Sequence, residues 1–200
     1  MHKVQDRTKA AYDRIAAEYA RTFFDFSLMS KQYDKFKSLC SKGSLILDIG
    51  CGPGRDVKYF SDNGYKVVGI EYSAGMLAQA RRMVPEADFR EMDMRRLGFK
   101  NGSFDAVWAN ASLHHLPKDQ AETAVKEMAR VLKRGGIVYL SVINGPGKDA
   151  HEINEDGRQF FSYRLEELEK LLDKNGLKMV DGYVTEGFGG DWVEVFARKV

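Results

Sequence analysis

The stretch Leu45-Ile46-Leu47-Asp48-Ile49-Gly50-Cys51-Gly52-Pro53-Gly54-Arg55 joins an apolar run to a helical pattern, and it decides the fold. The run Ser44–Ile49 has the composition of a buried strand. The glycines that follow have the spacing G-x-G-x-G, which permits a tight turn and lets a ligand approach the backbone. A helix that begins near Pro53 offers free N–H groups at its positive end. We therefore expect a ligand-binding turn between the first strand and this helix.

The same turn excludes two common phosphate-binding loops. A P-loop is excluded because no Gly-Lys-Ser/Thr sequence follows the turn. The dinucleotide fingerprint G-x-G-x-x-G fits badly, since its third glycine would fall at Arg55. Asp48 would also repel a pyrophosphate, whereas it would suit a ligand that presents an ammonium group. An NAD-dependent oxidoreductase is therefore disfavoured, and glycines that serve backbone geometry alone remain the alternative.

Strand-like and helix-like segments alternate after this turn, which predicts a parallel sheet with helices on both faces. Gly135 and Gly136 are expected to end the last of these helices. The predicted strands are Lys66–Glu71, Ala87–Met92, Ser103–Ala109 and Ile137–Ile143, and the predicted helices are Ser73–Met83 and Lys118–Lys133.

The two ends of the chain follow other patterns. Tyr12, Ile15, Ala16 and Tyr19 form an amphipathic stripe, and a second helical stretch covers roughly Lys31–Cys40. After the last parallel strand we expect a long loop, a helix and an antiparallel pair of strands at one edge of the sheet. These segments are Asn144–Asp156, Arg164–Asn175, Leu177–Tyr183 and Asp191–Ala197.

Polar residues follow three of the predicted strands. Glu71 ends the second strand, where a carboxylate can accept two hydrogen bonds from a ribose diol. Asp93 ends the third and could receive the exocyclic amine of a purine, and Asn110 follows the fourth. Each could also be a solvated residue at a strand end. Ligands of open α/β sheets gather at the carboxyl ends of strands, so their joint placement favours a nucleoside site.

These residues carry a resemblance to a known family. The region Ser44–Val142 resembles the class I S-adenosylmethionine-dependent methyltransferases, most of all their small-molecule branch of ubiquinone and menaquinone type. The matching motifs are Asp48-Ile49-Gly50-Cys51-Gly52-Pro53-Gly54, Val68-Gly69-Ile70-Glu71-Tyr72-Ser73, Asp93, Phe104-Asp105-Ala106-Val107 and Val131-Leu132-Lys133-Arg134-Gly135-Gly136. The resemblance implies an α/β, Rossmann-like, doubly wound sheet of seven mostly parallel strands, with one antiparallel strand in the edge region and an N-terminal helical lid.

The resemblance also implies S-adenosyl-L-methionine as cofactor and S-adenosyl-L-homocysteine as product. The glycine backbone would wrap the methionine part, Asp48 would support its ammonium group, and Glu71 would hold the ribose hydroxyls. The adenine would meet two side chains, an accepting carboxylate and a neighbouring backbone, while a carbonyl after the fourth strand would also touch the cofactor. The implied cofactor-binding residues are Asp48, Gly50, Gly52, Glu71, Tyr72, Met76, Asp93, Met94 and Asn110.

Methyl transfer from a sulfonium needs alignment and exclusion of water more than it needs a catalytic triad. His114 and His115 follow the fourth strand and are candidate bases, although either could instead pack or cap the next helix. Tyr12, Tyr19 and Tyr163 are candidate contacts of an apolar acceptor, with ordinary core packing as the alternative. No third ligand is spaced to make the two histidines a metal site, so none is predicted.

Composition sets the remaining expectations. The 200 residues carry 31 basic and 29 acidic side chains, and this balance favours a small-molecule acceptor over a nucleic acid. Two cysteines outside any CxxC pattern, no signal-peptide pattern and no long apolar run predict a cytoplasmic protein without a membrane partner. A monomer or homodimer is expected. A tRNA or other nucleic-acid methyltransferase, or a non-catalytic protein that binds S-adenosylmethionine, remains the alternative.

A single methyltransferase domain over residues 1–200 is the domain organisation that these patterns predict. Residues 1–43 would form the helical lid and residues 44–143 the cofactor-binding core. Residues 144–200 would supply the acceptor-side loop, a helix and the antiparallel strand pair. The lid is expected because aromatic residues that the cofactor site does not use cluster before the first strand and after the fifth.

Overall fold

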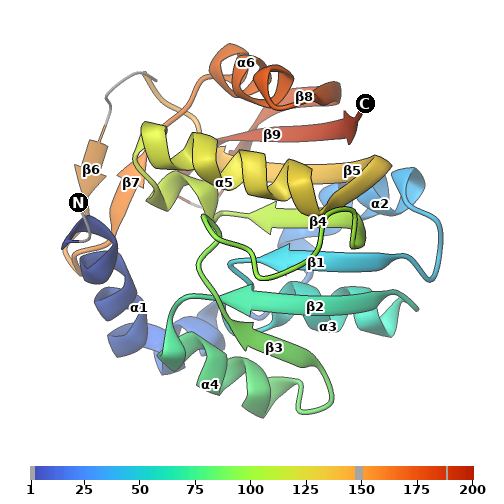
Figure 1. Ribbon diagram of the computed structural model, residues 1–200. Coiled ribbons are helices and arrows are strands. Elements are labelled where there is room, and N and C mark those ends of the chain that lie inside the picture. Colours follow the sequence, from blue (N-terminus) through green and yellow to red (C-terminus); the bar gives the residue numbers. More distant parts are fainter. Residues whose placement is uncertain (1–2, 147–150, 188) are drawn as a thin grey trace.

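One seven-stranded sheet runs through the middle of the protein (Figure 1). The computed structural model describes residues 3–146, 151–187 and 189–200. The strand order is β3-β2-β1-β4-β5-β9-β8, which confirms the predicted doubly wound sheet. The strands are β1 (Leu45–Ile49), β2 (Lys66–Glu71), β3 (Asp88–Glu91), β4 (Phe104–Asn110), β5 (Leu132–Ile143), β8 (Leu177–Gly187) and β9 (Gly190–Lys199).

The chain order reverses at β1, and this reversal positions the site. β1 pairs in parallel with β2 on one side and with β4 on the other, so β2 and β3 extend the sheet in one direction and β4 and β5 extend it in the opposite direction. A crevice opens at the carboxyl ends of strands at such a point. Within this sheet, β9 runs antiparallel to its neighbours β5 and β8, as the sequence predicted for this edge.

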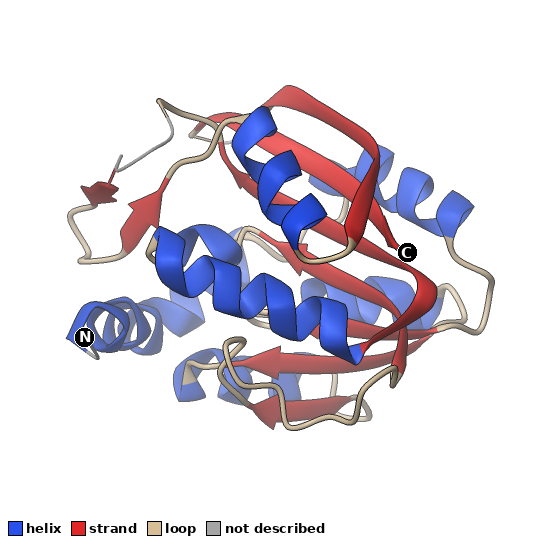
Figure 2. Ribbon diagram, turned by 45° about the horizontal axis from the view of Figure 1, so that its top comes forward, coloured by secondary structure: helices blue, strands red, loops and turns tan. Residues whose placement is uncertain are grey.

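Helices cover both faces of the sheet, as Figure 2 shows. α5 and α6 pack on one face, and α2 and α3 pack on the other, with α4 beside α3. Side chains of the strands therefore face packed helices on both sides, which explains their continuous apolar runs. The helices are α1 (Lys3–Thr22), α2 (Ser30–Leu39), α3 (Arg55–Asp62), α4 (Ala74–Met83), α5 (Lys118–Val131) and α6 (Leu165–Lys174).

The face beneath α2 and α3 is unusually aromatic. The Trp108 ring stacks on Tyr139 with centroids 3.9 Å apart. Tyr33 of α2 also stacks on Trp108, with centroids 5.4 Å apart. All three side chains are fully buried. Aromatic pairs of this kind add about 0.5–1.5 kcal/mol beyond the burial of their area. This layer fixes α2 against the strands just below the crevice.

α1 lies across the carboxyl ends of the strands and beside α4 (Figure 1). Its small side chains Ala11, Ala16 and Ala20 are buried. Asp13 accepts hydrogen bonds from the Ser73 hydroxyl at 2.6 Å and from the Gly75 N–H at 2.8 Å, both at the start of α4. The helix is thus tied to the rim of the crevice. No helix in the described ranges combines the length and apolar composition that a membrane crossing needs.

Two sequence predictions of secondary structure are wrong. α5 ends at Val131, and Gly135 and Gly136 lie inside β5 instead of ending the helix. The register against β4 slips there, because the paired positions jump from Phe104 to Ala106 on one strand while β5 advances from Leu132 to Ile137. The glycines permit that irregularity, since Gly135 has a φ of +76°.

The predicted loop after β5 also contains structure. A small hairpin of β6 (His151–Ile153) and β7 (Gln159–Phe161) stands beside α1 at the crevice. Each of its two strands has three residues, which is too short for an alternating sequence pattern to predict them.

Candidate functional site

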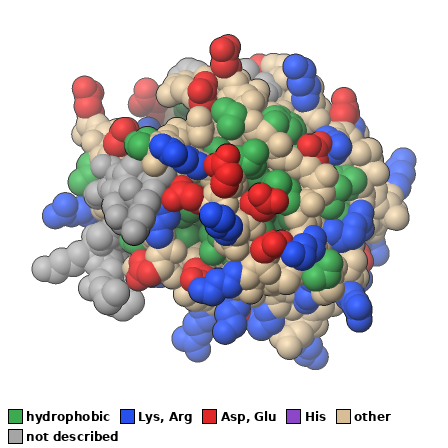
Figure 3. Space-filling model, turned by 90° about the horizontal axis from the view of Figure 1, so that it is seen from above, with side chains coloured by type: hydrophobic (Ala, Val, Ile, Leu, Met, Phe, Trp, Pro, Cys, Tyr) green, Lys and Arg blue, Asp and Glu red, His purple; other side chains and the backbone are tan. Residues whose placement is uncertain are grey.

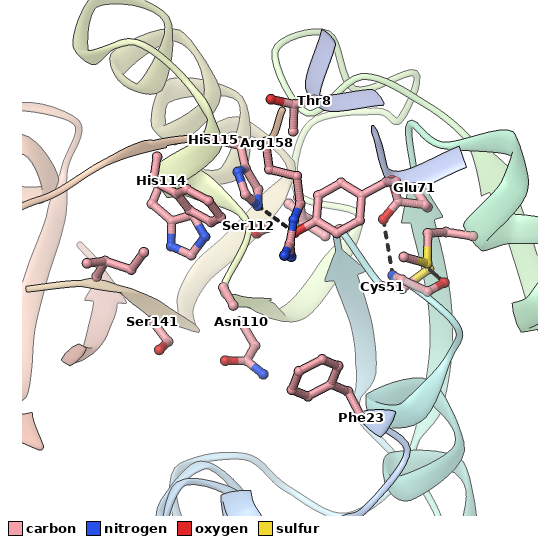
Figure 4. A pocket seen from close by; sticks show the side chains of 18 of the residues that line it. Thr8, Phe23, Cys51, Glu71, Asn110, Ser112, His114, His115, Ser141 and Arg158 are labelled. Atoms are coloured by element: carbon pink, nitrogen blue, oxygen red, sulfur yellow. Dashed lines mark hydrogen bonds between the residues drawn. The ribbon is translucent and has the colours of Figure 1, made fainter. Parts of the chain in front are cut away.

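A cavity of about 1130 Å³ opens at the carboxyl ends of the strands (Figure 4). It is closed on one side by α1 and on another by the β6–β7 hairpin. The structure brings most of the predicted site residues to its wall. Those that line it are Tyr12, Tyr19, Gly50, Gly52, Glu71, Tyr72, Met76, Asp93, Met94, Asn110, His114 and His115.

The glycine turn has the geometry that its spacing predicted. Gly50, Gly52 and Gly54 have φ values of +73°, +52° and +87°, a region that favours glycine. At Gly50 a Cβ would stand 2.5 Å from the Cβ of Ser112. At Gly52 a Cβ would have no atom within 4 Å, so this residue faces open cavity. The turn thus presents bare backbone to a ligand.

Glu71 braces this turn as well as facing the cavity. Its carboxylate accepts the Gly52 N–H at 3.1 Å, and the N–H groups of Tyr72 and Ser73 at 2.6 and 2.8 Å. Burial raises the pKa of Glu71, while these three backbone donors act to lower it. A carboxylate has about four acceptor positions, so capacity remains for a ligand hydroxyl.

Asp93 lines the cavity but already has a strong partner. The guanidinium of Arg95 makes an ion pair with its carboxylate, and the Arg95 N–H donates to Oδ1 at 2.9 Å. Arg95 also donates to Gln120 at 2.7 Å, which fixes the arginine. An exocyclic amine would therefore share this carboxylate with Arg95.

Asp48 lies behind the turn and is not on the cavity wall. Its side chain is 1% exposed, and its Oδ2 atom has no hydrogen-bond partner among the residues described. Burial, and then the charge of Asp56, raises the pKa of Asp48 well above its usual value. Asp48 is thus a buried acceptor directly behind the glycine backbone, where an ammonium group bound at the turn would complement it.

Asp56 is the ionised member of this buried pair. The Trp108 indole donates to it at 2.7 Å, the Tyr33 hydroxyl donates as well, and Arg55 contacts it at 2.6 Å. Burial acts to raise the pKa of Asp56, but Arg55 and the hydrogen bonds outweigh it and lower the pKa. Asn110 donates weakly to the same carboxylate at 3.4 Å, so the network reaches the end of β4.

The two adjacent histidines differ in their contacts. His115 lies 2.8 Å from the Tyr12 hydroxyl and 2.7 Å from the Gln159 carbonyl oxygen. His114 is 1% exposed, and its Nδ1 atom has no partner in the described part of the chain. Burial, with lesser effects of His115 and Arg158, lowers the pKa of His114 well below 6.5. Both rings are therefore neutral near pH 7.

Several cavity residues were missed by the sequence reasoning. The Trp192 ring lies 5.5 Å from the ring of His114, and the guanidinium of Arg158 lies over the Tyr12 ring at 5.3 Å. Glu194 is 3% exposed and also lines the cavity. Alternation along β9 places Glu194 on the same strand face as Trp192, so an acid at an inward position was the available signal.

Tyr163 does not reach the cavity, contrary to its selection as an acceptor contact. It is 2% exposed and belongs to the core beneath α5 and α6. The Lys118 ammonium lies 3.4 Å from its ring centroid and covers it. Tyr163 follows β7 and pairs through its backbone with Asn144, which turns its side chain inward.

Comparison with known sequences places this site in a family. A profile described as a methyltransferase domain matches residues 47–140, which contain the glycine turn, Glu71, Asp93 and Asn110. The chain is 32% identical over 139 residues to a phosphatidylethanolamine N-methyltransferase of Cereibacter sphaeroides, covering 64% of this chain and 67% of that protein. It is 30% identical over 152 residues to a demethylmenaquinone methyltransferase of Renibacterium salmoninarum, covering 73% and 62%.

Other curated relatives are considerably longer than the matched region. The chain spans 38% of the malonyl-acyl-carrier-protein O-methyltransferase of Enterobacter lignolyticus, with 35% identity over 98 residues and 49% of this chain covered.

A solved structure shares the whole fold. The 1,6-didemethyltoxoflavin-N1-methyltransferase of Burkholderia thailandensis, solved with 1,6-didemethyltoxoflavin and S-adenosylhomocysteine, superposes with a TM-score of 0.84. It is 21% identical, and the match covers 100% of this chain and 90% of that one. The profile match, the relatives and the glycine turn agree with one another, and this chain belongs to the class I S-adenosylmethionine-dependent methyltransferase family.

Proposed function

We propose that this protein transfers a methyl group from S-adenosylmethionine to a small-molecule acceptor. The observation that carries the proposal is the bare glycine turn at Gly50 and Gly52, braced by Glu71 at the edge of a large cavity. By their names, three relatives act on phosphatidylethanolamine, demethylmenaquinone and malonyl-acyl-carrier protein, so their acceptors do not agree on one chemistry.

The residues present fit this cofactor in two ways. Open space at Gly52 leaves room for a ligand exactly where a side chain would stand in any other residue type. Asp48 supplies a buried, unpartnered carboxyl oxygen behind the turn, which suits an ammonium group. S-adenosylmethionine, when bound, supplies a methyl group already activated on a sulfonium. Asp48, the glycine backbone, Glu71, Met76 and Asp93 are the residues that would hold it.

The chain's own residues then have three tasks. α1 and the β6–β7 hairpin shield the cavity from water, which protects an activated donor. The aromatic walls hold an acceptor in one orientation, and alignment of the reacting atoms is the main source of rate in such a displacement. His114 lines the same cavity with an unpartnered Nδ1 atom in the described chain, and it offers a hydrogen-bond acceptor there in the tautomer that protonates Nε2.

A small acceptor suits the surface as well as the cavity. Acidic and basic side chains are intermixed over the middle of the described face in Figure 3, while basic side chains gather along its lower edge, and the whole chain is near neutral. A nucleic-acid acceptor would be favoured by a continuous basic stripe, and its binding would fall steeply with salt.

Calorimetric titration tests the cofactor. We expect S-adenosylhomocysteine to bind with micromolar or tighter affinity and NAD to give no heat of binding. The converse result would refute the proposal. A release assay for S-adenosylhomocysteine across a metabolite library then tests turnover, and tight binding without turnover on any acceptor would favour a non-catalytic binding protein.

Glu71→Ala provides the matching variant. It removes the ribose acceptor together with the brace on Gly52, so we expect cofactor binding to weaken by about 1.5–3 kcal/mol, the scale of hydrogen bonds to a charged group. Glu91→Gln, at an exposed carboxylate one strand away, is the control and should bind normally. Unchanged affinity in a folded Glu71→Ala protein would contradict the assignment.

A further inference from the structure

The acceptor end of the cavity holds uncompensated negative charge. Within the described residues, every lining Lys or Arg has a carboxylate partner: Lys9 with Asp13, Arg55 with Asp56, Arg95 with Asp93 and Arg158 with Asp156. Four lining carboxylates away from the glycine turn make no ion pair in that part of the chain: Glu152, Glu186, Asp191 and Glu194. A cleft lined by one sign of charge concentrates ligands of the other sign.

Glu194 is the buried member of this group. Its carboxylate accepts hydrogen bonds from Gln32 at 3.3 Å, from the Tyr139 hydroxyl and from Ser141, all of them neutral donors. Burial raises the pKa of Glu194, and these three donors oppose the rise. A buried carboxylate without a cation is unfavourable, so a positively charged ligand would relieve it.

Sheet register places Glu194 in line with Asn110, the last residue of β4. Asn110 on β4 pairs with Ser141 on β5, and Ser141 pairs with Glu194 on β9. Paired residues of neighbouring strands point to the same face, so the three side chains form one row across the cavity floor. Glu194 therefore lies two strands from Asn110, a predicted cofactor contact.

Aromatic rings enclose the space above this row. Trp192 precedes Glu194 by two residues on β9 and shares its strand face. Its ring lies 5.5 Å from that of His114, and His114 lies 5.5 Å from Phe160 on the other side. Aromatic faces attract cations and ammonium groups in particular.

His114 supplies an independent indication of a ligand in the same space. It is 1% exposed, and the described residues provide no partner for its Nδ1 atom. In Figure 4 its ring projects toward the space that Ser141 and Asn110 border. In the tautomer that carries its proton on Nε2, Nδ1 accepts a hydrogen bond, and an N–H group of a ligand would satisfy it.

We propose that the methyl acceptor is an amine, whose nitrogen lies between Glu194 and His114. This inference rests on the proposed methyl transfer and specifies its substrate class. The neutral nitrogen uses its lone pair to form the new N–C bond while the C–S bond breaks and its electron pair stays on sulfur. The positive charge passes from sulfur to nitrogen, and the product ammonium later releases a proton to water.

Each residue has a defined part in that step. His114 accepts a hydrogen bond from an N–H of the amine and so turns the lone pair toward the methyl group. Glu194 and the Trp192 ring stabilise the charge that develops on nitrogen, because fixed groups in a dry site act most strongly where charge appears. A carboxylate acceptor, which is negatively charged, would instead be repelled by Glu194.

The test uses a permanent cation as a probe of the charged nitrogen. Benzyltrimethylammonium, benzyl alcohol and phenylacetate are titrated by calorimetry into the 200-residue protein saturated with S-adenosylhomocysteine. We expect the cation to bind at least tenfold more tightly than either of the others. Absence of cation binding, or equal binding of benzyl alcohol or phenylacetate, overturns the proposal.

Glu194→Gln then assigns the preference to its residue. We expect it to reduce the cation's advantage at least fivefold, while Glu169→Gln, an exposed carboxylate on α6 away from the cavity, leaves it unchanged. An unchanged advantage in Glu194→Gln refutes the role of Glu194. Should that variant fail to bind S-adenosylhomocysteine, the wild-type ranking decides alone. Wild-type protein that binds no S-adenosylhomocysteine refutes the proposed function instead.

Discussion

The Tyr12 hydroxyl lies 2.8 Å from Nε2 of His115, which joins α1 to the turn after β4. The other ring nitrogen, Nδ1, lies 2.7 Å from the carbonyl oxygen of Gln159 in β7. A carbonyl oxygen only accepts, so Nδ1 carries the proton and Nε2 accepts from Tyr12. His115 thus spends both nitrogens on holding three segments together, and His114 is left as the histidine available to a ligand.

Tyr12→Phe should measure the contribution of the Tyr12–His115 hydrogen bond to stability. The change removes the donor and leaves Nε2 of His115 without its partner, so we expect a loss of about 1–3 kcal/mol in the free energy of unfolding. Urea denaturation measures it. Tyr72→Phe is the matched control, because Tyr72 is 37% exposed and should lose less than about 0.5 kcal/mol. Equal losses in the two variants would argue against a hydrogen bond of this importance.

Buried His115 should also make the stability of the protein depend on pH. Burial lowers the pKa of His115 to about 4, whereas an unfolded histidine titrates near 6.5. Between these values the unfolded chain binds the extra proton, so the contribution of His115 is complete above about pH 6.5 and declines as the pH falls toward 4.

His115→Gln isolates that contribution from those of the buried acids. We expect the wild-type protein to lose about 2 kcal/mol of stability relative to this variant between pH 7.5 and pH 5, from 1.5 pH units at about 1.4 kcal/mol each. Urea unfolding of both proteins at the two pH values measures the difference. A constant difference would mean that His115 titrates normally in the folded protein.

The glycine turn allows ligand binding to be separated from backbone strain. Gly52→Ala and Gly135→Ala both place a Cβ at positive φ with no atom within 4 Å, so each should cost roughly 1–2 kcal/mol of stability. Only Gly52 faces the cavity. We expect Gly52→Ala to weaken S-adenosylhomocysteine binding at least tenfold and Gly135→Ala to leave it unchanged, as measured by calorimetry. Similar affinities in both variants would mean that the cofactor does not approach Gly52.

Local patterns were sufficient for most of the fold. β1, the glycine turn and α3 follow from one short stretch, and the helix predicted from Ser73 does begin there, because the Ser73 hydroxyl accepts the Met76 N–H at 3.1 Å and caps α4. The pair Gly135–Gly136 misled because a glycine pair ends a helix and permits a strand irregularity equally well. Here Gly136 packs against the carbonyl of Asp105, a contact that only the paired strand reveals.

The acceptor side depended on contacts between distant segments. Gln159 donates its N–H to Thr8 at 3.1 Å, and its carbonyl holds His115, so β7 takes its place from α1 and the turn after β4. Such contacts leave no periodic signal in three-residue strands. Arg158 reached the cavity in the same way, whereas Glu71 and Asn110 could be predicted because strand ends alone place them there.

Gly75 offers the sharpest test of α1 as a lid. A Cβ on this residue would stand 2.8 Å from both the Cα and the carbonyl oxygen of Asp13, so Gly75→Ala creates a steric clash that pushes α1 away from α4. The backbone of Gly75 is helical and carries no positive φ, and alanine favours a helix by about 1 kcal/mol over glycine. Backbone strain within α4 is therefore small, and the steric clash with Asp13 is the main effect of the substitution.

A lid and a fixed core helix respond differently to that steric clash. If α1 is a lid, it moves outward, α4 stays folded, and S-adenosylhomocysteine dissociates faster while the unfolding free energy changes by less than about 1 kcal/mol. If α1 is core, overpacking should lower the unfolding free energy by about 1–3 kcal/mol. Stopped-flow dissociation and urea unfolding of the same variant distinguish the two. We expect the lid result, because Asp13 contacts the start of α4 through hydrogen bonds from the Ser73 hydroxyl and the Gly75 N–H, which water can replace when this part of α1 moves outward.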